Sequence, residues 1–239
     1  MVVPASLGEV PHLLPRIETF ISAACGGPTP CPSPERLRWL SALEKLLAKR
    51  MPALPASDRT RLADVIYDEA KAASLDPVFI LAVIAVESGF DHVAQSQRGA
   101  RGLMQLRPST LRREAERSQL DGDLEDPVLN VRAGVRYYTR LIRAFGSPDL
   151  ALMAYNAGPN RILKYLEEKD GIPERFHVYP KRVKREVARL RLHLPKLRLG
   201  PPGGARESSG LGWHAAPAVA PRLQLGWQAG PKAGAPRPD

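Results

Sequence analysis

The feature that most constrains the fold is a run of ten apolar residues from Pro77 to Val86, with Glu87 directly after it. A run this short is compatible with a buried strand or a buried helix when periodicity alone is considered. Asp76 and Pro77 are typical of a helix start, and the alanines in the run also favour a helix. We therefore expect a helix that is buried on all sides by other elements.

The segments around this run have the apolar spacing of amphipathic helices. In the longest of them, Val131 and Tyr138 fall on one face and arginines on the other, and Gly146 is placed to end the helix. Ser33 and Ser57 are expected to cap two earlier helices. No alternating strand pattern competes, so the predicted fold class is all-α. The expected helices cover residues 33–50, 58–73, 77–86, 108–118, 127–145, 150–157, 159–168 and 178–194, with a loop at 89–102.

Proline placement suggests the domain limits. The 24 prolines of the 239-residue chain crowd the segments before residue 56 and after residue 194. We expect an N-terminal extension with one helix at 1–56, a folded domain at 57–194, and a disordered Pro/Gly-rich tail at 195–239. The first ten residues lack the pattern of a secretory signal, and no apolar stretch reaches the length of a transmembrane helix. Cys25 and Cys31 form either a small disulfide loop or two unpaired thiols.

The formal net charge of +10 indicates association with polyanions, either nucleic acid or an anionic cell envelope. No zinc-finger spacing, stacking-aromatic strand pattern or basic zipper is present, so nucleic acid is not the expected partner. A solvated basic surface with a basic tail also accounts for much of the charge. No histidine lies at ligand spacing near the cysteines, so no metal site is expected.

Glu87 has two interpretations. A carboxyl at the end of an apolar helix is partly desolvated and lies at the negative end of the helix dipole, and both effects raise its pKa. A carboxyl that stays protonated near neutral pH is what a glycosidase needs as its general acid. Alternatively, Glu87 is a solvated residue at a frayed helix end.

An ordinary glycosidase uses two carboxylates that flank the bond. The nearest acidic residue is Asp91, which has the position of a turn cap, and Asp121, Asp123 and Asp126 lie in a loop and a helix cap. No second catalytic carboxylate is therefore evident. This favours a mechanism in which the substrate supplies its own nucleophile.

Four sequence pieces occur in a specific order: ESGF at 87–90, GARGLMQL at 99–106, AYNAG at 154–158, and Tyr179. Together they resemble the soluble lytic transglycosylases with the goose-lysozyme-like fold, over about residues 60 to 192. The resemblance implies a lysozyme-like helical domain in which Glu87 protonates the oxygen between N-acetylmuramic acid and N-acetylglucosamine. Glu87 then takes the proton from the muramyl 6-hydroxyl, which closes to a 1,6-anhydro end. No metal or cofactor is implied.

The resemblance also implies a set of substrate-binding residues. Gln105 lines the sugar cleft in this family, and the hydroxyl of the late tyrosine points at the catalytic acid. Met104 is also compatible with a place in the core, and Asn156 with a helix-end cap, while Pro180 after the tyrosine is unexpected. The implied substrate-binding residues are Ser88, Gly102, Met104, Gln105, Tyr155, Asn156 and Tyr179.

The implied partners are peptidoglycan glycan strands and the anionic cell envelope, so we expect the cell envelope or periplasm as the location. Because no signal is visible, an envelope-spanning machinery is a further candidate partner. Two alternative functions remain open. The first is a hydrolytic muramidase of the same fold, and the second is a peptidoglycan-binding module without catalysis.

Overall fold

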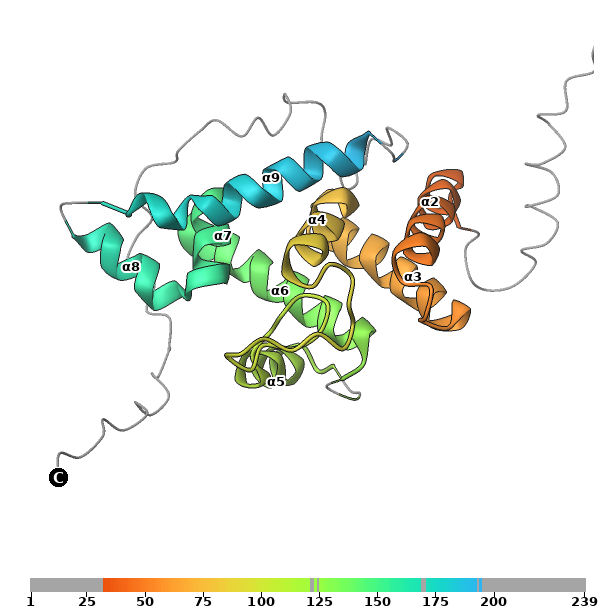
Figure 1. The fold of residues 1–239 in the computed structure, drawn as a ribbon, viewed down its shortest axis with the longest axis horizontal. Helices are drawn as coiled ribbons and strands as arrows, with labels where there is room; N and C mark the ends of the chain where they lie inside the picture. Colours follow the sequence, from red (N-terminus) through yellow and green to blue (C-terminus); the bar gives the residue numbers. More distant parts are fainter. Residues whose placement is uncertain (1–31, 121–122, 124, 169–170, 193, 195–239) are drawn as a thin grey trace, which may run out of the picture.

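The computed structural model describes residues 32–120, 123, 125–168, 171–192 and 194. Within them the fold is all-α, as predicted, and β-type pairing is limited to isolated bridges in the loop that follows α4 (Figure 1). The α-helices are α2 (Pro34–Arg50), α3 (Ala56–Ala72), α4 (Pro77–Glu87), α5 (Pro108–Arg117), α6 (Pro127–Phe145), α7 (Pro148–Ala157), α8 (Pro159–Glu167) and α9 (Val178–Arg191), and a short 3-10 helix, η1 (Glu174–Phe176), precedes α9.

A repeated cap starts several of these helices. Asp76 accepts a hydrogen bond from the backbone N–H of Val78 at 2.9 Å, and Asp126 does the same for Val128 at 2.9 Å. A proline follows each cap, where its missing N–H costs nothing and its fixed φ suits the first turn. The expected cap at Ser57 is wrong, because α3 already begins at Ala56 behind Pro55 and Ser57 lies inside the helix.

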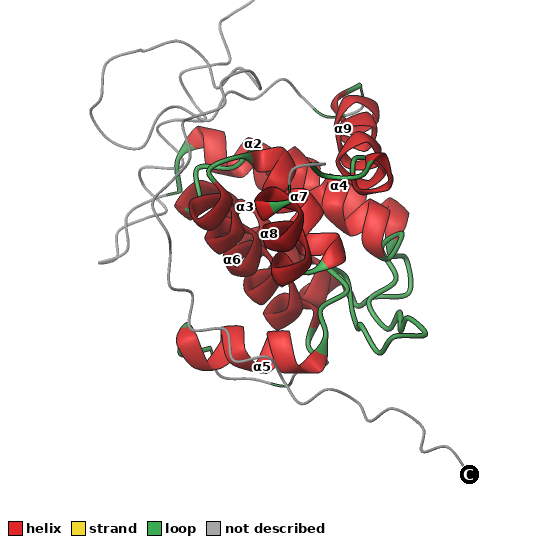
Figure 2. Ribbon diagram, turned by 90° about the vertical axis from the view of Figure 1, so that its left-hand side faces the viewer, coloured by secondary structure: helices red, strands yellow, loops and turns green. Residues whose placement is uncertain are grey.

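The apolar run forms α4, which lies at the centre of the core. Its residues from Pro77 to Ile84 are all buried. Helices α3 and α9 pack against α4, and α9 also contacts α7 (Figure 1). Both views place α5 at one end of the domain, beside the loop that joins α4 to α5 (Figure 2). The buried helix therefore carries its last residue, Glu87, to the start of this loop.

Helix α2 lies in the segment expected to be an extension, yet it is built into the same core. Trp39, Leu43 and Leu47 are buried with the α3 residues Leu62 and Ile66. The domain limits at residues 57 and 194 stay predictions, and Cys25, Cys31 and the tail lie outside the described residues. Among the described helices, none is long and apolar enough to cross a membrane.

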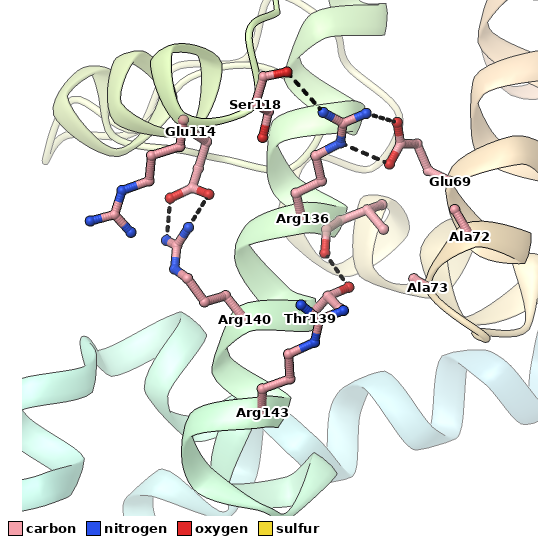
Figure 3. Close-up of a pocket in the computed structure, with 11 residues that line it drawn as sticks. Glu69, Ala72, Ala73, Glu114, Ser118, Arg136, Thr139, Arg140 and Arg143 are labelled. Atoms are coloured by element: carbon pink, nitrogen blue, oxygen red, sulfur yellow. Dashed lines mark hydrogen bonds and ion pairs between the residues drawn. The ribbon is translucent and has the colours of Figure 1, made fainter. Parts of the chain in front are cut away.

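Two ion pairs fasten the neighbouring helices α3 and α5 to α6. Arg136 on α6 donates to both carboxylate oxygens of Glu69 on α3, at 3.1 and 2.9 Å. One turn further along α6, Arg140 donates to both oxygens of Glu114 on α5, which is only 1% exposed. These four side chains line a cavity of about 350 Å³ between the three helices (Figure 3). A buried carboxylate is costly without its partner, so the pairs fix α3 and α5 against α6.

Candidate active site

Glu87 is the last residue of α4, and its side chain is partly buried. Burial raises its pKa from the ordinary 4.5 to about 7, because desolvation disfavours the charged form. A hydrogen bond from Tyr179 and the positive charge of Arg182 act in the opposite direction and lower the pKa. The carboxyl is therefore divided between its protonated and ionised forms near neutral pH.

Tyr179 supplies the hydrogen bond. Its ring is buried in the first turn of α9, and its hydroxyl donates to Oε1 of Glu87. Pro180 follows it in the same turn, where a proline leaves no intrahelical hydrogen bond unmade. Burial and the Glu87 charge raise the pKa of Tyr179 well above 10, so the phenol stays protonated and remains a donor. The proline therefore does not turn the tyrosine away from the acid.

Ser88 closes the end of α4. Its hydroxyl donates to the carbonyl of Ile84 at 3.1 Å and accepts from the N–H of Phe90 at 3.2 Å. Both bonds are local, and they terminate the helix directly after Glu87. The serine thus fixes the backbone turn beside the acid.

The second sequence motif forms a tight turn that is held by its own backbone. Arg101 and Leu106 exchange N–H···O=C bonds of 2.9 and 3.1 Å, and the N–H of Gly102 donates to the carbonyl of Ala94 at 3.0 Å. Gln105 projects from this turn with φ +47°, a left-handed conformation that non-glycine residues adopt infrequently. The turn therefore presents Gln105 in a strained backbone conformation.

The side chain of Gln105 is partly exposed and acts as a donor within the loop. Its Nε2 donates to the carbonyls of Ala94 at 3.0 Å and Gly102 at 2.9 Å. The reversed amide would place its oxygen against two carbonyl oxygens, so this orientation is fixed by its partners. Oε1 accepts no hydrogen bond from the described residues. Toward a ligand, Gln105 therefore offers an acceptor.

Tyr155 on α7 holds this turn. Its hydroxyl donates to the carbonyl of Met104 at 2.7 Å, and burial, followed by the charge of Glu87, raises the pKa of Tyr155 well above 10. Its ring packs against Tyr137, with 5.4 Å between centroids. Met104 is only 2% exposed and lies in the core, the second of the two places considered for it. Asn156, which follows Tyr155 in the sequence, is exposed, and its side chain has no partner among the described residues.

The acidic residues considered as a second carboxylate have structural partners. Asp91 is exposed and accepts from the N–H of Val93 at 3.0 Å, while Asp123 accepts from the N–H of Glu125 at 3.0 Å. Asp126 caps α6 and pairs with Arg61 at 3.2 Å. Asp121 lies outside the described residues. Among the described residues, Glu87 is thus the carboxyl whose surroundings favour acid catalysis.

Two residues of this region, Asn130 and Gly134 on α6, were not predicted from the sequence. Asn130 is 2% exposed, and its side chain bonds the backbone of the 101–104 turn. The helical spacing could have indicated them, because Asn130 and Gly134 lie on the same inward face of the helix as Tyr138. A polar residue on a buried face needs a partner, which here is the turn carrying Gln105.

Comparison with known proteins identifies the domain. Residues 64–175 match the family model described as the transglycosylase SLT domain. This part of the chain is similar to a transglycosylase SLT domain. A soluble lytic murein transglycosylase of Escherichia coli (strain K12) is 30% identical over 99 residues, covering 39% of this chain and 15% of that protein. An endo-type membrane-bound lytic murein transglycosylase A of Klebsiella pneumoniae is 31% identical over 123 residues, covering 44% of this chain and 61% of that protein. The chain thus spans less than two thirds of the length of either relative.

Solved structures agree on the fold of the SLT domain. The lytic transglycosylase Slt of Pseudomonas aeruginosa, an inactive mutant with glutamine in place of a glutamate, has a TM-score of 0.50 at 25% identity, covering 66% of this chain and 31% of that chain. The 70 kDa soluble lytic transglycosylase of Escherichia coli has a TM-score of 0.50 at 23% identity, covering 66% of this chain and 29% of that chain. The predicted lysozyme-like helical fold is therefore confirmed.

Proposed function

We propose that the SLT domain is a lytic transglycosylase that cleaves peptidoglycan between N-acetylmuramic acid and N-acetylglucosamine and leaves 1,6-anhydro ends. The observation that carries the proposal is the carboxyl of Glu87, with a pKa of about 7 and a hydrogen bond from Tyr179. The relatives are named as lytic murein transglycosylases, and one solved relative is titled an inactive glutamate-to-glutamine mutant. The names support the class of reaction, and the inactive mutant supports an essential glutamate.

The first step of the proposed reaction uses the protonated form of Glu87. Its proton passes to the glycosidic oxygen as the bond to the anomeric carbon of the muramyl sugar breaks, and the N-acetylglucosamine portion leaves as an alcohol. The acetamido oxygen of the muramyl sugar stabilises the positive charge that develops at this carbon. A carboxyl with a pKa near 7 is about half protonated at neutral pH and largely protonated at lower pH, so it can act as a general acid there.

The second step uses the carboxylate that remains. Glu87 takes the proton from the muramyl 6-hydroxyl, whose oxygen bonds to the anomeric carbon and displaces the acetamido oxygen. The bond from Tyr179 and the charge of Arg182 both favour the ionised form at this stage. The acid regains its proton at the end of the cycle, and no water is consumed.

Among the remaining residues, Gln105 and Asn156 are proposed to bind the glycan, and the others to hold the site in place. Gln105 offers Oε1 as an acceptor for a substrate N–H or O–H, and the free amide of Asn156 can both donate and accept. Ser88 and Tyr155 position the backbone beside these groups, because their hydroxyls are bonded to protein carbonyls. Gly102 and Met104 shape the turn from within.

The proposed setting is the cell envelope. The net charge of +10 supports association with the stem-peptide carboxylates of peptidoglycan and with anionic wall polymers. The names of the relatives, soluble and membrane-bound murein enzymes, support the same setting.

Digestion of purified sacculi tests the proposed function. The parent chain and Glu87→Gln are incubated with the same sacculi, and the released muropeptides are analysed by mass spectrometry. We expect anhydro-muropeptides from the parent and a loss of at least a thousandfold in their rate of release from Glu87→Gln. Reducing ends alone would instead indicate a muramidase. Equal release of sugar by both proteins would exclude Glu87 as the acid, and no release by the parent would favour a binding module.

A further inference from the structure

The turn that presents Gln105 is held from inside the domain by one buried side chain. Asn130 on α6 accepts a hydrogen bond from the N–H of Met104 through Oδ1 at 2.8 Å. Its Nδ2 donates to the carbonyl of Arg101 at 3.0 Å. The two bonds hold the two sides of the Gly102–Leu103 segment. The reversed amide would set donor against donor and acceptor against acceptor, so both bonds depend on this one orientation.

The close approach of Asn130 requires a residue without a side chain at position 102. A Cβ on Gly102 would lie 2.6 Å from Nδ2 of Asn130, and its φ of +76° is also one that favours glycine. The Asn130 amide therefore fills the space beside the turn. No room remains there for a side chain at position 102.

One helical turn further along α6, Gly134 provides the second half of the support. A Cβ at this position would lie 2.8 Å from Cβ of Met104 and would also collide with its sulfur. Glycine is otherwise unfavourable in a helix interior. Its presence at this buried position allows the Met104 side chain to lie directly against the helix backbone.

Met104 is also held by Tyr155, whose hydroxyl donates to the Met104 carbonyl at 2.7 Å. The N–H, the carbonyl and the side chain of Met104 are thus each held by a different residue. Gln105 follows it immediately, and its left-handed φ of +47° is costly unless the surroundings impose it. The contacts to Met104 fix the residue that directly precedes Gln105.

We propose that Asn130 and Gly134 are positioning residues of the glycan-binding site, which act by holding the 101–106 turn so that Gln105 keeps its strained conformation. Neither residue contacts the glycan in this proposal. The proposal rests on the function proposed above, because it assigns Gln105 to substrate binding. The support of the 101–106 turn by Asn130 can be measured without an activity assay.

Amide hydrogen exchange of the parent, Asn130→Ala and Asn130→Asp tests the support of the loop directly. We expect the amides of Met104 and Gln105 to exchange at least ten times faster in Asn130→Ala, with the protection of α4 and α6 unchanged. Asn130→Asp keeps the acceptor for Met104 and loses the donor to Arg101, so its exchange rates should lie between those of the other two proteins. It also serves as the second variant if Asn130→Ala does not fold.

Activity on sacculi tests whether that support matters for the reaction. We expect kcat/KM to fall about tenfold to a hundredfold in Asn130→Ala and in Gly134→Ala, because a displaced binding group misplaces the substrate. The matched control is Thr139→Val on the same helix, whose hydroxyl bonds only the carbonyl of Val135 at 2.8 Å. This control should retain parental activity. All assays are run well below the melting temperature measured for each protein.

Two results would overturn the proposal. The first is parental exchange at Met104 and Gln105 in both Asn130 variants. The second is a loss of activity that Thr139→Val shares, or that merely follows the unfolded fraction of each variant. If the parent releases no sugar from sacculi, the proposed function fails, while the exchange rates still decide whether Asn130 holds the turn.

Discussion

Replacing Glu87 with glutamine should stabilise the fold. The gain should appear only at pH values above about 4.5, where the carboxyl of the unfolded chain loses its proton. The pKa of Glu87 is raised from 4.5 to about 7 by burial. Between these pH values the folded protein binds a proton that the unfolded chain has already released. Its stability therefore falls as the pH rises through this window and levels off above it. Glutamine has a similar shape, can accept the same bond from Tyr179, and carries no charge at any pH.

The size of the effect follows from the shift. Each unit of pKa difference corresponds to about 1.4 kcal/mol, so ionisation of Glu87 costs the folded state about 3 kcal/mol above pH 7. For a domain of roughly 160 residues, this corresponds to a difference of about 6–12 °C in melting temperature. Below pH 4.5 the carboxyl is neutral in both states, and the two proteins should melt at similar temperatures.

The measurement is a pair of thermal or urea unfolding curves for each protein at pH 4 and at pH 8. The decisive quantity is the change with pH in the difference between the variant and the parent, because all other titrating groups cancel from it. Glu116→Gln, at an exposed position on α5, is the control and should show no such change. A difference between Glu87→Gln and the parent that is equal at both pH values would refute the desolvation argument.

Three further results are expected. Tyr179→Phe removes a hydrogen bond to the Glu87 carboxylate that is worth about 1.5 kcal/mol. The pKa of Glu87 should therefore rise by about one unit above 7, and the alkaline limb of the pH–activity profile should move to higher pH with it. An unmoved limb would contradict this. Arg140→Leu should cost about 3–5 kcal/mol in the free energy of unfolding, because it leaves Glu114 buried and unpaired, and adding Glu114→Leu should recover most of the loss. Binding of the parent to sacculi should weaken as salt rises from 0.05 to about 0.5 M, and salt-independent binding would argue against an electrostatic contribution.

The sequence was sufficient for the fold class and for the place of Glu87 at the end of a buried helix. Both follow from one strong pattern, because a helix without a polar face must lie in the core, and Glu87 is the first charged residue at its end. The Asp-Pro pairs then placed the starts of α4 and α6 correctly. These are local effects that do not depend on the rest of the chain.

The support of the Gln105 turn was not predictable in the same way. Asn130 and Met104 are 26 residues apart, and their hydrogen bond depends on how α6 packs against the loop. Similarly, Tyr155 was expected only as a substrate-binding residue, and the sequence did not show that its ring packs on Tyr137 and its hydroxyl bonds the turn. Periodicity shows that a residue faces inward, but it does not show which backbone group it meets there.

The pairing of Glu87 with Tyr179 also determines how much of the chain is needed as a transferable unit. The family match ends at residue 175, before α9 begins. A segment cut at that point would keep the acid, but it would lose the tyrosine and expose the face of α4 on which α9 packs. Any fusion or transplant of this domain into another protein must therefore extend at least to the end of α9, at Arg191. The segment needed for the proposed chemistry is therefore longer than the segment that matches the family model.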